Sequence, residues 1–322
     1  MRLRLFREIP NFDFFRVQKL TLGLSAVLIV ASLASWLVIG LNFGIDFKGG
    51  TTIRTESTSS VDVGAYRDAM TPLGLGDVTI TEVFDPTFAA DKHVAMIRIQ
   101  AQDDQEAVTP ETIQLVEEAL RAVDPSVTFP SVESVGPKVS GELIMTAVIA
   151  VAASLAAILF YIWLRFEWQF SVGAVAALAH DVILTIGVFS ILQIRFDLAT
   201  IAALLTIIGY SINDTVVIFD RLRENLIKFK STPLRDLMNR TVNETLSRTI
   251  MTSGTTLIAL IALLILGGDV IRGFVFAITW GVIVGTYSSV YVAKNMVLLL
   301  GVKRDWSKPD NNGGTQYANI DA

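Results

Sequence analysis

The residues best suited to chemistry are ionisable side chains that lie inside long apolar stretches. His180 and Asp181 lie near the middle of one stretch, and Asp214 lies in the next one, beside Asn213. An ionisable side chain in hydrocarbon is costly, so such a residue indicates an ion or proton pathway by default. Asp214 is six residues from the charge of Asp220, which places it ~9 Å deeper at ~1.5 Å per helical residue.

Arg248 is the candidate partner of Asp214, because it begins a later apolar stretch at a similar depth from the same membrane face. An aspartate and an arginine on neighbouring helices could form an ion pair, which protonation of the aspartate would weaken. We therefore predict that Asp214 and Arg248 form a proton relay, in which protonation of Asp214 is coupled to helix movement, with His180, Asp181 and Asn213 as candidate supporting residues. Two other interpretations stay open: Arg248 could extend to the interface from a helix edge, and Asp181 could pair with His180 alone.

The composition argues against several other kinds of site. The absence of cysteine excludes disulfides, thiol catalysis and cysteine-bound metals. His93 and His180, the only histidines, lie in different regions, so we expect no metal site and no bound cofactor. With a net charge of −5 and no basic domain, the chain is not expected to bind nucleic acid. An intramembrane aspartyl protease would need a Gly-x-Gly-Asp motif, whereas Ser-Ile-Asn precedes Asp214, so we expect no enzyme.

Six uncharged or nearly uncharged stretches predict the elements that position these residues. The chain is 52% apolar and only 18% charged, with a mean hydropathy of +0.54. Each stretch is close to the ~20 residues that a membrane-spanning helix needs. The stretches are 20–45, 143–164, 168–194, 198–219, 249–268 and 273–293. We therefore predict a polytopic α-helical membrane protein with six transmembrane helices, of which the first, at 20–41, is too long to be a signal peptide.

The distribution of lysine and arginine predicts the orientation of these helices. If the N-terminus is inside, the inner segments carry 17 basic residues and the longer outer segments carry 9. The positive-inside rule then places both termini in the cytoplasm. The predicted cytoplasmic parts are the N-terminal segment 1–19, the loop 220–248 within the helical region 142–300, and a polar, disordered tail at 301–322.

Residues 42–141 are predicted to form a folded domain on the far side of the membrane. Alternating patterns indicate strands, and a Thr109 cap followed by Pro110 begins the second of two helices. The predicted strands are 51–56, 78–84, 93–101 and 127–135, and the predicted helices are 61–73 and 110–123. This β-α-β-β-α-β order is that of a ferredoxin-like α+β domain. It could be a packing module or a binding surface.

Two further patterns concern helix packing. Gly281, Gly285 and Ser289 are spaced by four residues, which permits the close approach of another helix. Apolar residues at helical spacing between 234 and 250 indicate an amphipathic helix. Such a helix could lie on the cytoplasmic interface or pack against the bundle.

Several motifs resemble the SecD/SecF family of bacterial protein-export membrane proteins, and its SecF branch in particular. They occur in the family's order between about residues 10 and 300. The motif after the first span is Gly-Ile-Asp-Phe-Lys-Gly-Gly-Thr at 44–51, and the fourth span contains Gly-Tyr-Ser-Ile-Asn-Asp at 209–214. Further matches are Val-Gly-Pro-Lys-Val at 135–139, Ala-His-Asp-Val at 179–182 and Ser-Arg-Thr-Ile-Met-Thr-Ser at 247–253.

The resemblance implies half of a bundle of the resistance-nodulation-division type, completed by SecD. It implies a location in the bacterial inner membrane, with residues 42–141 periplasmic and membrane lipids around the helices. It also implies work with the SecYEG channel, SecA and YajC on unfolded preproteins, powered by the proton-motive force. The family's proton-relay residues fall on Asp214 and Arg248. The alternative is a half-transporter of the same superfamily that exports a small molecule or lipid, although such exporters carry larger outer domains.

Overall fold

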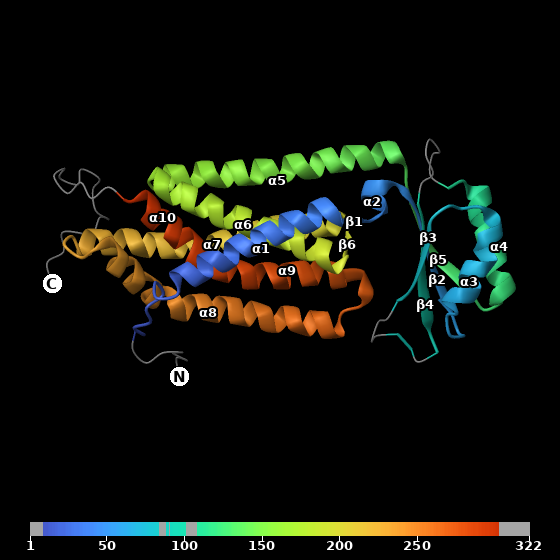
Figure 1. The fold of residues 1–322 in the computed structure, drawn as a ribbon. Coiled ribbons are helices and arrows are strands. Elements are labelled where there is room, and N and C mark those ends of the chain that lie inside the picture. Colours follow the sequence, from blue (N-terminus) through green and yellow to red (C-terminus); the bar gives the residue numbers. More distant parts are fainter. Residues whose placement is uncertain (1–8, 84–87, 90, 101–107, 303–322) are drawn as a thin grey trace, which may run out of the picture.

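The computed structural model describes residues 9–83, 88–89, 91–100 and 108–302. It has two parts, a bundle of long helices and a four-stranded sheet domain at one end of it (Figure 1). The start of α1 and the end of α10 lie at the other end of the bundle (Figure 1). The predicted disordered tail lies outside the described residues from 303 onward, as do the first eight residues of the predicted cytoplasmic segment.

The bundle contains six helices that are long and apolar enough to cross a membrane, which confirms the predicted number. The helices are α1 Gln18–Val38, α5 Pro137–Arg165, α6 Trp168–Leu192, α7 Leu198–Lys228 and α8 Leu234–Leu266, and then α9 Asp269–Ser288, which continues through a π-helical turn, Ser289–Ala293, into α10 Lys294–Leu300. Each helix contains most of one predicted span.

The fourth and fifth helices are longer than the predicted spans. The chain leaves helical structure only at 229–233 between α7 and α8, whereas the predicted cytoplasmic loop was 220–248. The amphipathic stretch is therefore the first half of α8. Its apolar residues Leu237, Met238 and Val242 are at most 1% exposed and join the core of the bundle. Packing, rather than a separate helix on the interface, explains the pattern.

Close approach of α7 and α9 follows from the stripe of small residues. A Cβ atom at Gly281 would lie 2.3 Å from the side chain of Ile207, and one at Gly285 would lie 3.0 Å from Ser211. Ser289 continues the stripe, and its hydroxyl lies 2.8 Å from that of Thr215. These contacts confirm the packing role that the spacing predicted.

The sheet domain has the predicted split βαβ order. Its strands are β2 Gly50–Ser57, β3 Val78–Val83, β4 His93–Gln100 and β5 Thr128–Val135, and its helices are α3 Val63–Met70 and α4 Pro110–Val123. The spatial order is β3-β4-β2-β5, and every pairing is antiparallel. Both helices cover the face away from the bundle (Figure 1). The core between them and the sheet includes Ile53, Tyr66, Ile97 and Leu120, each at most 1% exposed.

Local signals in the sequence set the ends of both helices. Asp62 accepts a hydrogen bond from the Ala65 amide at the start of α3. Thr109 caps α4 by accepting one from the Thr112 amide, with Pro110 in the first turn, as predicted.

A short junction ties the sheet domain to the bundle. It consists of the two-residue strands β1 Asn42–Phe43 and β6 Arg195–Phe196, which pair in parallel, and of α2 Ile45–Lys48. Gly49 and Gly50 then turn the chain into β2 with φ angles of 74° and 129°, which favour glycine. Within α2, Asp46 accepts a hydrogen bond from the Leu198 amide at 3.0 Å. The entry to the sheet is thus bonded to the first turn of α7.

Candidate functional site

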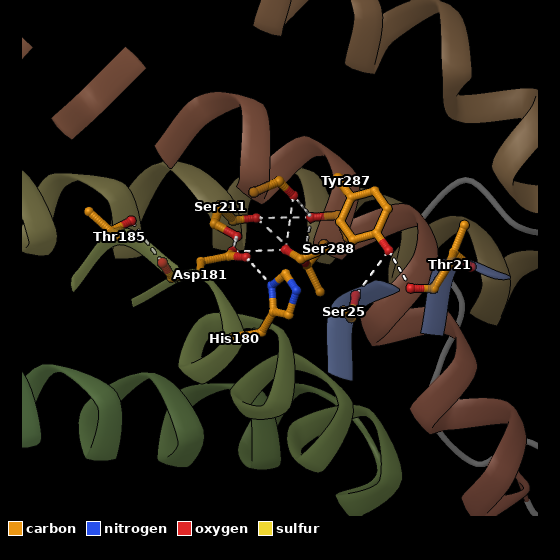
Figure 2. A network of polar contacts seen from close by, with 11 residues as sticks. Thr21, Ser25, His180, Asp181, Thr185, Ser211, Tyr287 and Ser288 are labelled. Atoms are coloured by element: carbon orange, nitrogen blue, oxygen red, sulfur yellow. Dashed lines mark hydrogen bonds and ion pairs between the residues drawn. The ribbon is translucent and has the colours of Figure 1, made fainter. Parts of the chain in front are cut away.

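Asp181 lies at the centre of a buried polar network inside the bundle (Figure 2). It belongs to α6 and is 1% exposed. Its Oδ1 lies 3.0 Å from His180 Nδ1. Its Oδ2 accepts hydrogen bonds from Ser211 of α7 at 2.7 Å and from Ser288 of α9 at 2.8 Å. One carboxylate therefore joins three helices, and both of its oxygens have partners.

The network continues from His180 to α1. The ring of His180 stacks on that of Tyr287, with 5.9 Å between the ring centroids. The Tyr287 hydroxyl donates to the backbone oxygen of Thr21 at 2.7 Å and lies 2.9 Å from the Ser25 hydroxyl (Figure 2). His180 Nε2 is buried, and it has no hydrogen-bond partner within the part of the chain that the structure describes.

Asp214 lies one helical turn after Ser211 on α7, and its environment differs from that of Asp181. It is 3% exposed, and its Oδ2 lacks a hydrogen-bond partner among the residues described. Three residues of α8, Arg248, Thr252 and Ser253, lie close enough to act on its charge. Ser253 in turn lies 2.7 Å, hydroxyl to hydroxyl, from Thr286 of α9. Asp214 is therefore a buried acid with an open oxygen, in contrast to the saturated Asp181.

Arg248 lies on the helix next to Asp214, as predicted, but does not contact it directly. Its side chain is exposed on the surface of α8, whereas Asp214 faces the interior. Within residues 9–83, 88–89, 91–100 and 108–302, no ion pair closer than 4.0 Å joins the two. The two side chains therefore lie on neighbouring helices without forming a direct ion pair.

Asn213 is not part of the buried site. It is exposed on α7, and its side chain forms no hydrogen bond with the residues that the structure describes. Consecutive residues of a helix point about 100° apart, and here Asp214 faces the interior while Asn213 faces outward. Of the three candidate supporting residues, the structure places His180 and Asp181 in the buried polar network and Asn213 outside it.

Sequence reasoning missed several functional side chains. Ser211, Tyr287 and Ser288 carry the network between helices, but a hydroxyl in an apolar span is too common to single out. The charge pattern predicts that Lys294 marks the inner boundary of the sixth span. The structure instead buries it to 2% exposure, with Nζ 3.9 Å from the centroid of the Phe15 ring. The aromatic residue that covers it lies before α1, so no local signal could have shown this.

The arrangement is suited to holding and passing protons. Asp181, His180, Ser211 and Ser288 form a continuous hydrogen-bonded set. Asp214 offers a second carboxylate, one helical turn after Ser211 on α7. Metal binding has less support, because the described residues contain no cluster of three or more His, Cys, Asp or Glu side chains that could hold an ion.

Two family models match the chain. The C-terminal model of the protein-export membrane proteins SecD/SecF matches residues 115–303, which include all five helices after the sheet domain. The SecD/SecF GG-motif model matches residues 34–61, which include the Gly49–Gly50 turn into β2.

Curated relatives agree over the whole length. The protein translocase subunit SecF of Cereibacter sphaeroides is 68% identical over 100% of this chain and 99% of its own. That of Rhodobacter capsulatus is 64% identical over 96% of this chain and 95% of its own.

Among solved structures, SecDF of Thermus thermophilus, described as a translocon-associated membrane protein, superposes with a TM-score of 0.79 at 38% identity. That match covers 90% of this chain but only 39% of the SecDF chain, so the chain spans about two fifths of its solved relative. The fold, the two family models and the full-length relatives agree: the chain belongs to the SecF branch of the SecD/SecF family of protein-export membrane proteins.

Proposed function

We propose that the chain pairs with a SecD-type partner and uses the proton-motive force to promote the passage of preproteins across the bacterial inner membrane. The observation that carries this proposal is Asp214 of α7, a buried carboxylate with one open oxygen that lies beside Thr252 and Ser253 of α8. An ionisable side chain is costly to bury in a membrane, so its presence there indicates a pathway for an ion or a proton. The relatives are named as translocase subunits, which fits a transport component rather than an enzyme.

The charge on Asp214 would control how α8 sits against α7. When the carboxylate is charged, it attracts the guanidinium of Arg248. When it is protonated, that attraction is lost and α8 is free to shift. The network around Asp181 holds α6, α7 and α9 together throughout. Because Asp46 bonds to the first turn of α7, a movement of that helix would be passed to the sheet domain.

A partner is needed to complete the bundle. The outward faces of α1, α5 and α8 carry exposed apolar side chains such as Leu37 at 81%, Met145 at 62% and Ile258 at 72%. Lipid would cover part of this surface and a SecD-type half the rest, because this chain matches only 39% of the SecDF chain. SecYEG, SecA and YajC are proposed as further partners from the resemblance, and unfolded preproteins as the substrate.

The proposed orientation follows the basic residues. Both termini lie in the cytoplasm and the sheet domain in the periplasm, because 17 basic residues fall on the side of the termini and 9 on the side of the sheet.

The test compares two substitutions on α7 in a strain that lacks SecF. Asp214→Asn removes the titratable group, whereas Asp220→Asn removes an exposed aspartate that pairs with Arg165 at 2.9 Å. We expect Asp214→Asn to abolish the part of preprotein export that depends on the proton gradient, with normal assembly with SecD, and Asp220→Asn to retain it. Full complementation by Asp214→Asn would refute the proposal.

Arg248 is tested in the same strain. Arg248→Ala is expected to lose export as Asp214→Asn does, and Arg248→Lys to retain more because it keeps the charge. Normal export by Arg248→Ala would show that the arginine only extends to the interface.

A further inference from the structure

The segment just before α1 is bound through its backbone to two asparagines of α8. Asn239 and Asn243 lie about one helical turn apart on that helix. Asn243 accepts a hydrogen bond from the Phe12 amide and Asn239 accepts one from the Phe14 amide, each at 2.9 Å. Both asparagines also donate to the backbone oxygen of Phe12, again at 2.9 Å. Residues 12–15, called here the N-terminal strap, are thus bonded to α8 through their own backbone.

The side chains of the strap enclose a lysine of α10. Lys294 Nζ lies 3.9 Å from the centroid of the Phe15 ring, 5.5 Å from that of Phe14 and 5.6 Å from that of Tyr291. Lys294 is 2% exposed, and its Nζ has no hydrogen-bond partner among the residues that the structure describes. An ammonium group is attracted to the faces of aromatic rings, most strongly where water is excluded. The three rings are therefore the closest favourable contacts of this buried amine.

Two charged side chains also act on Lys294. Asp13 of the strap attracts its ammonium, and Arg235 of α8 repels it. Asp13 is exposed, and its carboxylate accepts a hydrogen bond from the Phe15 amide at 3.0 Å. Arg235 is exposed as well, and its guanidinium lies 5.2 Å from the centroid of the Phe15 ring. The strap thus supplies an acid and two aromatic rings that favour the ammonium, against one opposing arginine.

The first half of α8, to which the strap is bonded, is also bonded to α7. Asn225 of α7 donates a hydrogen bond to the Thr241 hydroxyl at 3.0 Å. Arg221 of α7 pairs with Glu244 at 2.7 Å. With the two asparagines, polar contacts therefore recur along α8 from residue 239 to residue 244.

The second half of α8 has looser polar contacts with its neighbours. Ser253 lies 2.7 Å from Thr286 of α9, and Tyr210 of α7 lies 3.4 Å from Thr256, hydroxyl to hydroxyl in both cases. Beyond these, Ile258 is 72% exposed in this chain. Within the chain, α8 is thus bonded more firmly along its first half than along its second.

We propose that Lys294 is a positioning residue, whose buried ammonium holds the N-terminal strap on α10, and that the strap in turn fixes the first half of α8. A movement of α8 then takes place in its second half. Arg248 lies five residues after Asn243, where the firmly bonded half ends. The proposal deepens the proton-driven function and rests on it for the cause of the movement, but the hold of Lys294 on the strap does not need that cause.

The test measures two distances from α5 in the full chain, purified with a cysteine-free SecD-type partner and placed in lipid. Spin labels are attached to pairs of introduced cysteines, and pulsed electron paramagnetic resonance gives the distribution of each distance. The first pair joins Leu164, which is 67% exposed, to the exposed Asp236 in the first half of α8. The second pair joins Met145, which is 62% exposed, to Ile258 in the second half.

Substitutions in the strap contacts should act on the first pair. We expect Lys294→Met to broaden its distance distribution, because methionine is unbranched and fills a similar space but carries no charge. A role in packing alone would leave the distribution of Lys294→Met like that of the wild type. Asn243→Ala should broaden it as well, by releasing the backbone of the strap. Lys228→Met is the matched control, because it makes the same change at an exposed position of α7. Gel filtration and circular dichroism establish that each variant is folded.

Asp214→Asn, which imitates the protonated aspartate, tests where α8 moves. We expect it to shift the second pair and leave the first unchanged, and the double variant Asp214→Asn/Lys294→Met to shift both. An equal shift of both pairs by Asp214→Asn alone would contradict the fixed first half.

Two further outcomes separate this proposal from the proton-driven function. If Lys294→Met keeps the narrow distribution of the first pair, the ammonium does not hold the strap, and the proposal is wrong whatever Asp214→Asn does. If Asp214→Asn shifts neither pair, the movement of α8 is refuted together with the proton-driven account. The role of Lys294 is then still decided by the first pair in the chain that keeps Asp214.

Discussion

At the scale of single residues, the two buried aspartates differ in their hydrogen-bond partners. Asp181 has both carboxylate oxygens engaged, by His180 and by two serines from other helices. Asp214 keeps one oxygen open and lies within reach of a charge on the neighbouring helix. A saturated carboxylate stabilises the arrangement of helices, whereas an open one can change its protonation without breaking a set of bonds. We therefore propose a positioning role for Asp181 and a proton-carrying role for Asp214.

Stability measurements should separate these roles. Asp181→Ala leaves two serine hydroxyls and an imidazole without their acceptor, so we expect a loss of about 2 kcal/mol or more in the free energy of unfolding. Asp214→Asn keeps the shape of the side chain and breaks fewer bonds, and we expect a change below about 1 kcal/mol. Denaturant unfolding of the purified chain in detergent measures both. Equal losses would mean that Asp214 is as firmly bonded as Asp181.

Asp124 shows the same logic outside the membrane. Burial alone would raise its pKa, but hydrogen bonds from Ser57, Ser126 and Ser59 outweigh that effect and lower the pKa to about 2. Because this is below the ordinary value of 3.8, the bonds stabilise the sheet domain above pH 3.8. That contribution is lost as the pH falls toward 2. Since the group is partly exposed, we expect it to be on the order of 1 kcal/mol.

Pepsin digestion of the full chain across this pH range tests the prediction. We expect Asp124→Asn to be cleaved in the sheet domain faster than the wild type above pH 3.8, with the difference vanishing near pH 2. A difference that stays constant across the range would show that Asp124 acts by packing and not by its charge.

At the scale of elements, the contact between α7 and α9 depends on the absence of a side chain at Gly281. A methyl group there would meet Ile207 at 2.3 Å. We expect Gly281→Ala to cost about 1–3 kcal/mol through overpacking. Gly209→Ala is the matched control, because nothing lies within 4 Å of the Cβ it would add to α7. Thermal unfolding compares the two, and Ile207→Ala should partly rescue Gly281→Ala. Equal unfolding temperatures for the two alanine variants would contradict the packing account.

The elements that the sequence predicted are those whose signals are local. The Thr109–Pro110 start of α4, the alternation in β2 and the four-residue spacing from Gly281 each lie within one segment, and the structure bears them out. The two-residue pairing of β1 with β6 was not predicted, because its partners are about 150 residues apart and too short to show a pattern. Asp181 could be predicted because an acid inside an apolar span is unusual. Its partners Ser211 and Ser288 could not, because serines are common in such spans and the contacts join different helices.

At the scale of the whole molecule, the main prediction is the side on which each part lies. The chain contains no cysteine, so all thiol labelling of the chain would come from the one cysteine that is introduced. We expect Ser59→Cys, at an exposed position two residues after β2, to react with an impermeant thiol reagent added to intact cells. Ser231→Cys, in the connection between α7 and α8, should react only after lysis. The reverse pattern would invert the topology and place the sheet domain in the cytoplasm.

The most direct test of the central claim is proton flux in vesicles that contain the chain purified with its SecD-type partner. A pH-sensitive dye inside the vesicles reports proton entry when a gradient is applied. We predict flux through the wild-type complex and through Asp220→Asn, and flux at the level of empty vesicles through Asp214→Asn. Wild-type flux through Asp214→Asn would contradict the account, because the buried carboxylate would then not carry the proton.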